Sequence, residues 1–357
     1  MKNERYYYRL MPPAEQQIYR LIYNGIKQFA LNIVVELEVS VVQVQETYLK
    51  VLYDNPEFYY INQTVIKLSG TYGYYLLMPE YIYTPLQIKK IDEDIRKVID
   101  KVKAGAEKYI GDPFRLEKYL HDSVVKSVAY DYESLKKTDC YNAHSIVGAF
   151  LDNKAVCEGV AKAFKVLCNE FDIKCIVVIG KADPSGDLSG DDYHAWNLVK
   201  IGDESYYVDV TWDNCYEGDM QYISYDYFNL TTEEIKLDHD PIGELPLCES
   251  DRLNYFTVTG NIISTYHELL GLMEDKFKDK KIVFRALKDC REFRSPQELK
   301  EKTITALMHT MFMKKNVREF RIMFNSLHNV VNILFRTKYV SKIDITKYPK
   351  GKKKKAE

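Results

Sequence analysis

Apolar and polar residues along the first 111 positions follow the spacing of helices and strands in turn. After Pro12 and Pro13, apolar residues recur three and four positions apart through Ile26, which is the spacing of one helix face. Two tyrosine-rich runs further on have the composition of strands. These patterns predict a small α+β unit with helices over 18–26, 42–56 and 85–111 and strands over 31–39, 58–68 and 72–84.

The middle of the chain changes from helices to strands. Asp112 and Pro113 have the residue types of a helix N-cap and first turn, and the helix that they begin is expected to end near Asp131. A second helix and three strands are predicted after it, over 157–171, 173–181, 193–201 and 205–213. Helices followed by an antiparallel run predict an α+β domain over 112–255.

The C-terminal part of the chain returns to alternating helices and strands. Its pattern predicts helices over 264–277 and 295–312 and strands over 281–287, 318–324 and 329–337. These elements indicate a compact α/β accessory domain over 256–345. It is the second accessory domain predicted, after the N-terminal one over 1–111. The last residues, 346–357, hold a run of four lysines, and we expect them to form a solvated, disordered tail.

Composition and charge place the chain among soluble globular proteins. Hydrophobic residues make up 46% of the 357 residues and charged residues 29%, which is enough apolar surface to offset the entropy of ordering. The 50 Lys and Arg residues against 52 Asp and Glu residues leave a net charge of −2, which argues against a dedicated nucleic-acid-binding protein. No stretch approaches about 18 uninterrupted apolar residues, so no membrane span is expected. The N-terminus has no apolar segment of signal-peptide length, so we expect a cytoplasmic location.

Seven cysteines are spread along the chain, and none forms a C-x-x-C pair. That spacing excludes zinc-ribbon and thioredoxin-type sites, and the sequence predicts neither a metal nor a cofactor. A chain of this size does not need disulfides to fold, which favours a reducing compartment. Because seven is odd, at least one thiol is unpaired within the chain.

Cys157 differs from the other cysteines because it falls where a loop ends and a helix is predicted to begin. The positive end of the helix dipole and the unsatisfied N–H groups there lower the pKa of a thiol and favour the nucleophilic thiolate. The same N–H groups can receive the oxyanion of a tetrahedral intermediate. A buried structural cysteine at a helix start would fit this stretch equally well.

His194 and Asp209 add a candidate base and an orienting carboxylate on the strands that follow. If the hairpin turn is centred between Gly202 and Asp203, the two side chains share one sheet face. They are then diagonal neighbours, about 7–8 Å apart and within side-chain reach. A turn centred one residue earlier would place them directly opposite each other, still on one face. The pattern therefore permits a cysteine nucleophile, a histidine base and an orienting aspartate.

Three strings carry a specific resemblance, namely VCEGVAKAF, YHAWN and YYVDVTWD. In order and spacing they closely resemble the three core motifs of the transglutaminase-like superfamily, which has the papain-like fold. The resemblance covers 112–255 and implies an α+β core in which a helix bearing Cys157 packs on an antiparallel sheet bearing His194 and Asp209. N-terminal α+β and C-terminal α/β accessory domains would flank this core.

The same resemblance implies thiol acyl transfer on an amide bond. It gives Cys157 the role of nucleophile, His194 that of general base and acid, and Asp209 that of orienter. The acyl group passes to water in a cysteine peptidase or amide hydrolase and to a lysine amine in a protein-glutamine transglutaminase, and we favour hydrolysis. The expected substrate is a protein or peptide. The alternative from another class is a non-catalytic adaptor that keeps the fold, which the intact triad disfavours.

The motifs leave the oxyanion-hole side chain open. Papain has a glutamine shortly before its cysteine, and Leu151 occupies that position here. Tyr130, Tyr141 and His144 are the possible donors. The acidic loop that precedes the candidate base, over 183–192, fails the EF-hand pattern, and we interpret it as a flexible lid rather than a calcium site.

Other conspicuous residues are assigned structural roles. Trp196 and Trp212 flank the proposed His–Asp pair and are expected to pack in the core. Glu158 is expected to complement the helix dipole, and Asn197 and Cys168 to be structural. The remaining histidines have no carboxylate or cysteine at metal-ligand spacing and are expected at the surface or in the core: His121, His239, His267, His309 and His328.

Overall fold

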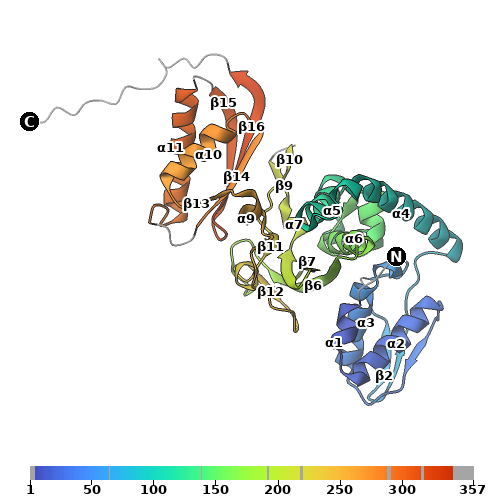
Figure 1. The fold of residues 1–357 in the computed structure, drawn as a ribbon. Coiled ribbons are helices and arrows are strands. Elements are labelled where there is room, and N and C mark those ends of the chain that lie inside the picture. Colours follow the sequence, from blue (N-terminus) through green and yellow to red (C-terminus); the bar gives the residue numbers. More distant parts are fainter. Residues whose placement is uncertain are drawn as a thin grey trace, which may run out of the picture. The chain divides into compact units, whose positions relative to one another are not determined.

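The computed structural model of the chain describes residues 5–63, 65–137, 139–190, 193–217, 220–287, 291–314 and 317–340. The chain forms two compact units, Met1–Tyr255 and Phe256–Glu357 (Figure 1). The predicted tail, 346–357, lies outside the described residues. The predicted boundary near residue 111 falls inside the first unit, so the further division of that unit stays a prediction.

The N-terminal part of the first unit combines helices with a three-stranded antiparallel sheet in the order β1-β3-β2. Its elements are α1 (Tyr6–Leu10), α2 (Pro13–Lys27), β1 (Ile33–Val35), α3 (Val41–Asp54), β2 (Leu68–Thr71) and β3 (Tyr74–Leu77). The helices predicted over 18–26 and 42–56 are confirmed. The strand predicted over 58–68 is wrong, because that segment begins in the 3₁₀ turn Pro56–Phe58 and β2 starts only at Leu68. Residues 58–63 are all buried, so their aromatic content reflects burial rather than the alternation of a strand.

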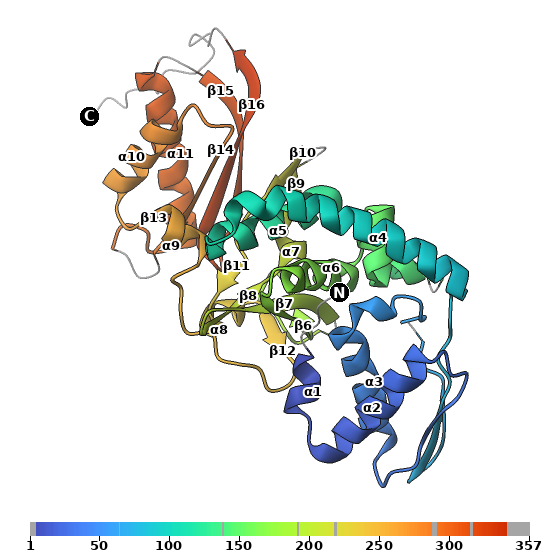
Figure 2. The ribbon, with the colours of Figure 1, turned by 45° about the vertical axis from the view of Figure 1, so that its right-hand side comes forward.

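Two long helices and the helix that begins at the candidate cysteine form one side of the central part (Figure 2). Thr84 and Gln87 form a reciprocal capping box at the start of the first helix, and the Asp112 carboxylate caps the second. The elements are α4 (Pro85–Ala106), a 3₁₀ turn (Glu107–Tyr109), α5 (Pro113–Ser127), β4 (Ala129–Tyr130), 3₁₀ turns (Ser134–Lys136, Tyr141–His144), a π-helical turn (Gly148–Asp152), β5 (Lys154–Ala155) and α6 (Cys157–Glu170).

A five-stranded antiparallel sheet in the order β11-β8-β7-β6-β12 packs against α6. Its strands are β6 (Lys174–Ala182), β7 (Tyr193–Ile201), β8 (Glu204–Val208), β11 (Phe228–Leu230) and β12 (His239–Pro241). The central hairpin pairs Ile201 with Glu204 and Asn197 with Val208, which is the register expected for a turn between residues 202 and 203. Gly202 has φ +63°, a left-handed conformation that glycine adopts without a steric cost.

Short elements connect the last strands of this sheet. They are α7 (Val210–Asp213), β9 (Asn214–Glu217), β10 (Met220–Ile223) and α8 (Thr232–Ile235). The Trp196 side chain of β7 is fully buried among Ile176, Val178 and Leu198, as expected for a core tryptophan. The sheet thus provides a rigid support from which the hairpin residues project.

The second unit has its own sheet and its own core. Four strands lie in the order β13-β14-β16-β15. The elements are α9 (Tyr255–Thr259), β13 (Ile262–Ile263), α10 (Tyr266–Lys276), β14 (Lys281–Ala286), α11 (Pro296–Met313), β15 (Val317–Asn325) and β16 (Val330–Val340). Leu269 of α10, Leu307 of α11 and Phe284 of β14 are buried in one apolar cluster. The helices and strands predicted for this part of the chain are confirmed.

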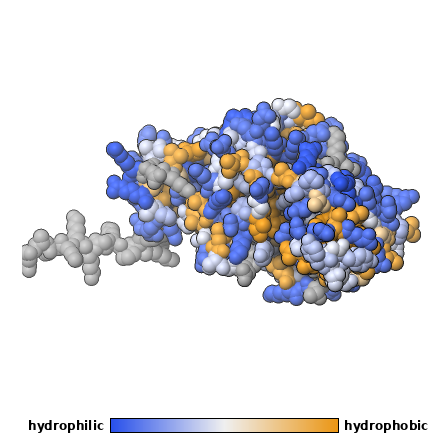
Figure 3. Space-filling view, turned by 90° about the horizontal axis from the view of Figure 1, so that it is seen from below, coloured by the Kyte–Doolittle hydropathy of each residue, from blue (hydrophilic) through white to orange (hydrophobic). Residues whose placement is uncertain are grey.

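The helices in the described ranges include none with the length and apolar character needed to cross a bilayer. In the space-filling view of Figure 3, hydrophobic and hydrophilic residues are interspersed over the visible face.

Candidate active site

Cys157 is the first residue of α6, and one residue, the N-cap Val156, separates it from the short strand β5. The Val156 side chain at the N-cap offers no acceptor to the N–H groups of the first turn. Gly159 allows the helix to approach the preceding loop, because a Cβ there would lie 2.4 Å from the carbonyl oxygen of Ala143. The thiol is half-buried, so it remains within reach of solvent.

His194 projects from β7 between two tryptophan rings. Its imidazole stacks on Trp196 at 5.9 Å between ring centroids and on Trp212 at 5.3 Å. The His194 Nε2 atom lies 2.7 Å from Oδ2 of Asp209, and only 8% of the residue is exposed. The two tryptophan rings therefore fix the plane of the imidazole, and the Asp209 carboxylate fixes its tautomer.

Asp209 lies one residue beyond the strand on which the sequence placed it. β8 ends at Val208, and Asp209 is the N-cap of α7, whose last residue is Asp213. Its Oδ1 atom accepts hydrogen bonds from the backbone N–H groups of Thr211 (2.9 Å) and Trp212 (3.1 Å). The prediction of a strand through 213 is wrong, because this carboxylate satisfies the N–H groups of a helical turn instead. The cap leaves Oδ2 free to face the histidine.

Charges around His194 favour its protonated form. Burial alone would lower its pKa, but the Asp209 carboxylate and the Cys157 thiol in hydrogen-bond contact with the ring outweigh burial and raise the pKa to about 10. Burial likewise disfavours the charged form of Asp209, yet His194 and His239 hold the pKa of that carboxyl well below its usual range. The structure thus brings the three predicted residues, Cys157, His194 and Asp209, into one hydrogen-bonded row.

Tyr130 is the one candidate oxyanion donor that reaches the thiol. Its hydroxyl is in hydrogen-bond contact with both the side chain and the backbone of Cys157, and burial raises its pKa. His144 instead directs Nδ1 to the Glu158 carboxylate at 3.0 Å, and Tyr141 lies in the same 3₁₀ turn as His144. Of the three donors that the sequence left open, Tyr130 is the one that contacts the nucleophile.

One family model matches part of the chain. Residues 98–212 match the family model of the transglutaminase-like superfamily. The chain carries a transglutaminase-like core. The strings around Cys157 and His194 lie inside the matched segment, and so does Asp209.

Two solved structures are similar over part of the chain. “Crystal structure of a TGase” is 15% identical with a TM-score of 0.31, and the match covers 53% of this chain and 52% of that one. “The Crystal Structure of a Putative Cysteine Protease from Cytophaga hutchinsonii” is 18% identical with a TM-score of 0.25, covering 41% of this chain and 61% of that one. This chain therefore spans less than two thirds of either structure. No curated protein matches the chain.

One turn into α6, next to Cys157, lies a partly buried ion pair that the sequence analysis did not predict. Glu158 was expected only to complement the helix dipole, but its carboxylate pairs with Lys162 at 2.5 Å and with His144. Burial opposes the charge on Glu158, while Lys162 and His144 lower its pKa. The fully buried Lys162 ammonium also donates to the Gln63 side chain and lies 5.5 Å from the Tyr53 ring centroid. The i,i+4 spacing of Glu158 and Lys162 on a predicted helix is the sequence signal that could have indicated this ion pair.

His239 is a second residue of the site that the sequence reading missed. It has no carboxylate at metal-ligand spacing in the sequence and was expected at the surface or in the core, and it is fully buried, but in the fold it faces two carboxylates. The His239 Nε2 atom lies 3.2 Å from Oδ2 of Asp209, and Nδ1 lies 2.6 Å from Oδ1 of Asp238. β12 brings the ring to the sheet edge by pairing His239 with Ala182 of β6. Sequence spacing does not reveal a neighbour that arrives through a separate edge strand.

Among the described residues, the possible metal-ligand atoms of His194, Asp209 and His239 lie within 4.8 Å of one another. Both imidazole Nε2 atoms already point to the same Asp209 oxygen. A cation would have to displace both of these hydrogen bonds, so we describe the cluster as a hydrogen-bonded network.

The acidic loop predicted as a lid is described only in part. Residues 191 and 192 lie outside the described ranges. Asp183 accepts a hydrogen bond from the backbone N–H of Ser185 at 2.7 Å, which is the geometry of a local turn.

Proposed function

We propose that this chain is a thiol acyl-transfer enzyme that acts on amide bonds of a protein or peptide, with hydrolysis as the favoured outcome. The observation that carries the proposal is the His194 ring, held by Asp209 on one side and in contact with Cys157 on the other. This is the nucleophile, base and orienter arrangement of a thiol triad. The transglutaminase-like core of residues 98–212 supports the same reaction class.

The tautomer follows from the contacts of His194. Because Nε2 donates to Asp209, Nδ1 is the nitrogen left to exchange a proton with Cys157. The thiol gives its proton to Nδ1, and the resulting thiolate attacks the amide carbonyl carbon. The carbonyl π electrons move to oxygen, and a tetrahedral oxyanion forms.

Collapse of that intermediate breaks the C–N bond. The imidazolium returns its proton to the leaving nitrogen, which departs as an amine or as ammonia and leaves a thioester on Cys157. Neutral His194 then takes a proton from water as that water attacks the thioester. The second tetrahedral intermediate collapses with cleavage of the C–S bond, which releases a carboxylic acid, and the His194 imidazolium returns its proton to the Cys157 sulfur.

Tyr130 is the side chain that we assign to the oxyanion. Its hydroxyl lies against both the thiol and the backbone of Cys157, where the oxygen of an attacked carbonyl would be placed. A hydroxyl donor and a backbone N–H together would stabilise the charge that develops on that oxygen. This assignment replaces the glutamine of papain, whose position holds Leu151.

The test is mass spectrometry of a peptide mixture incubated with the protein and a primary amine. Cleavage, deamidation and amine incorporation give three different mass changes, and we expect cleavage or deamidation that Cys157→Ala abolishes. Cys140→Ala is the matched control, because the thiol contact of Cys140 is with its neighbour Asp139. Amine incorporation as the main product would identify a transglutaminase. Products that persist in Cys157→Ala would contradict the enzyme proposal and leave the non-catalytic adaptor as the alternative.

A further inference from the structure

One oxygen of Asp209 serves two histidines. Its Oδ2 atom lies 2.7 Å from Nε2 of His194 and 3.2 Å from Nε2 of His239. The triad reaction uses the first imidazole and leaves the second without a role. His239 is fully buried, and its ring contacts Trp212 at 4.3 Å and Trp196 at 4.8 Å between centroids.

Both ring nitrogens of His239 face carboxylates. Nε2 faces Asp209 and Nδ1 faces Asp238 at 2.6 Å. An ionised carboxylate only accepts hydrogen bonds, and an imidazole that donates from both nitrogens carries a positive charge. Tyr227 donates its hydroxyl to the other oxygen of Asp238 at 2.8 Å, which keeps that carboxylate oriented.

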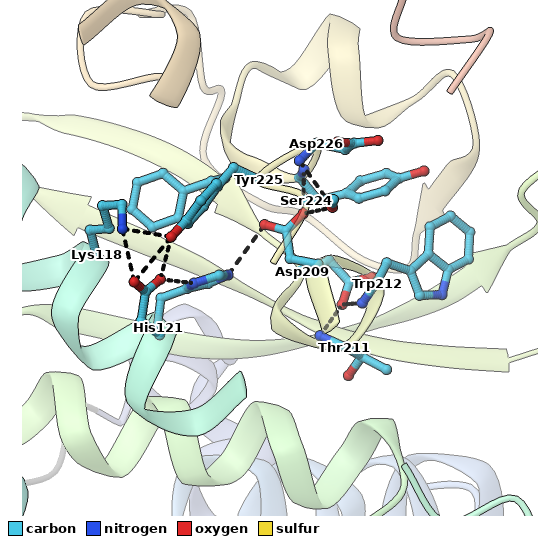
Figure 4. A network of polar contacts seen from close by, with 12 residues as sticks. Lys118, His121, Asp209, Thr211, Trp212, Ser224, Tyr225 and Asp226 are labelled. Carbon is cyan, nitrogen blue, oxygen red and sulfur yellow. Dashed lines mark hydrogen bonds and ion pairs between the residues drawn. The ribbon is translucent and has the colours of Figure 1, made fainter. Parts of the chain in front are cut away.

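The far end of the same turn repeats this arrangement. Asp213, the last residue of α7, lies 3.2 Å from Nε2 of His121, and Nδ1 of that ring lies 3.2 Å from Asp122. Figure 4 shows Lys118 and His121 on one side of this network and the turn that holds Asp209 and Trp212 on the other. Each end of α7 is therefore held by an imidazole placed between two carboxylates.

We propose that His239 is a positioning residue that places a positive charge on Asp209 and thereby sets the pH range in which His194 and Cys157 form an ion pair. The proposal rests on the proposed function of the triad. His239 does not touch the reacting atoms but acts through the Asp209 oxygen that it shares with His194. Among the described residues, the titratable groups in contact with the ring are Asp209, Asp238, His194 and Tyr227.

The direction of the effect follows from charge. A cation beside Asp209 weakens the attraction of that carboxylate for the His194 proton and favours the Cys157 thiolate. When the cation is removed, both His194 and Cys157 hold their protons up to a higher pH. The His194 and His239 ring centroids are 5.8 Å apart, and at an effective dielectric constant of about 20 a unit charge at that distance shifts a titration by roughly one to two pH units.

The experiment measures the rate of Cys157 alkylation by iodoacetamide from pH 4 to pH 11, with peptide mapping to follow this thiol alone. For a triad, the alkylation rate plotted against pH has a plateau. Its lower edge is the pH at which Cys157 loses its proton, and its upper edge is the pH at which His194 loses its proton. In His239→Gln, which keeps one amide donor near Asp209, we expect the lower edge to move up and the upper edge, which reports the His194 proton, to pass beyond the measured range. The same substitution at the exposed His309 of the second unit should leave both edges in place.

Two further variants separate charge from folding. Asp238→Asn replaces a carboxylate that only accepts with an amide that can donate to Nδ1 of His239, so the positive charge on the ring is no longer favoured. Both edges should again move up, by less than in His239→Gln because a negative charge is lost with the positive one. His121→Gln loosens the far end of α7 and should leave both edges in place while lowering the plateau. Near-ultraviolet circular dichroism identifies any variant that fails to fold, in which case Asp238→Asn decides.

The outcomes distinguish the two proposals. A wild-type profile without a plateau overturns the triad and with it the proposed function. A wild-type plateau whose edges stay within about 0.2 pH units in His239→Gln and Asp238→Asn, well below the shift expected for a unit charge, overturns the role of His239 and leaves the triad. Equal movement of the edges in His121→Gln would also overturn it, because the effect would then come from loosening the turn.

Discussion

Two buried histidines face the two ends of one helical turn, but only one of them faces a thiol. His194 contacts Asp209 at the start of α7, and His121 contacts Asp213 at its end. Both pKa values are raised against the effect of burial, to about 10 for His194 and about 9 for His121. The second nitrogen of His121 lies against Asp122, whereas the second nitrogen of His194 is left for Cys157. A His–Asp pair is therefore a structural unit, and the chemistry depends on what the second nitrogen meets.

The largest predicted effect comes from the aspartates themselves. Asp209→Asn should lower turnover by about 10⁴-fold, because an amide facing Nε2 can stabilise the wrong tautomer of His194. Asp213→Asn, the matched change at the His121 end, should leave turnover far above that of Asp209→Asn and reduce stability instead. Steady-state kinetics and urea unfolding of both variants check this. Equal losses of turnover would contradict the distinction between the two ends.

The next effect concerns a group present only at the His194 end. Tyr130→Phe should lower turnover by about 10²–10³-fold, because one of the donors assigned to the oxyanion is lost. The rate of Cys157 alkylation, which forms no oxyanion, should fall much less. Tyr132→Phe is the control, since Tyr132 is 71% exposed. If alkylation and turnover of Tyr130→Phe fall together, the hydroxyl acts on the thiol rather than on the oxyanion.

A smaller predicted effect concerns His121 alone, through the pH dependence of the free energy of unfolding. The pKa of His121 is raised in the folded state to about 9 from 6.5, with burial opposing and Asp122 and Asp213 outweighing it. Its contribution to the free energy of unfolding is therefore complete below pH 6.5 and is lost as the pH rises through 9. The loss is on the order of 3 kcal/mol at about 1.4 kcal/mol per pH unit.

Urea unfolding of the wild type and His121→Gln at pH 6 and pH 9.5 measures this contribution. The variant should lose less stability over the interval than the wild type does. Parallel losses in the two proteins would show that other groups, His194 among them, account for the pH dependence.

Local sequence patterns were sufficient to place Cys157 at a helix start and His194 beside Asp209. The helix start at Cys157 and the Gly202 turn each depend on neighbouring residues, and the hairpin register that the turn sets carries His194 to Asp209. Within this hairpin, the strand prediction failed where the Asp209 side chain caps α7, because a cap and a strand residue have the same polar character.

The other contacts of the site come from distant segments and left weaker signals. His239 joins Asp209 across 30 residues through an edge strand, and Gln63 meets Lys162 across 99 residues. No periodicity links such positions, because their proximity is decided by the packing of whole elements. Over 58–63 the aromatic run suggested a strand, but every one of these residues is buried in a turn segment outside the N-terminal sheet.

The hydrogen bond between Gln63 and Lys162 bears on how this core can be cut and recombined. Lys162 is fully buried in the helix that carries Cys157, and Gln63 accepts from its ammonium across the first unit. The Tyr7 hydroxyl likewise donates to the Val177 carbonyl at 2.6 Å. A fragment beginning at residue 112 would contain every triad residue yet leave a buried cation without this acceptor. As a module for truncation or domain exchange, the smallest transferable piece therefore has to start upstream of Tyr7.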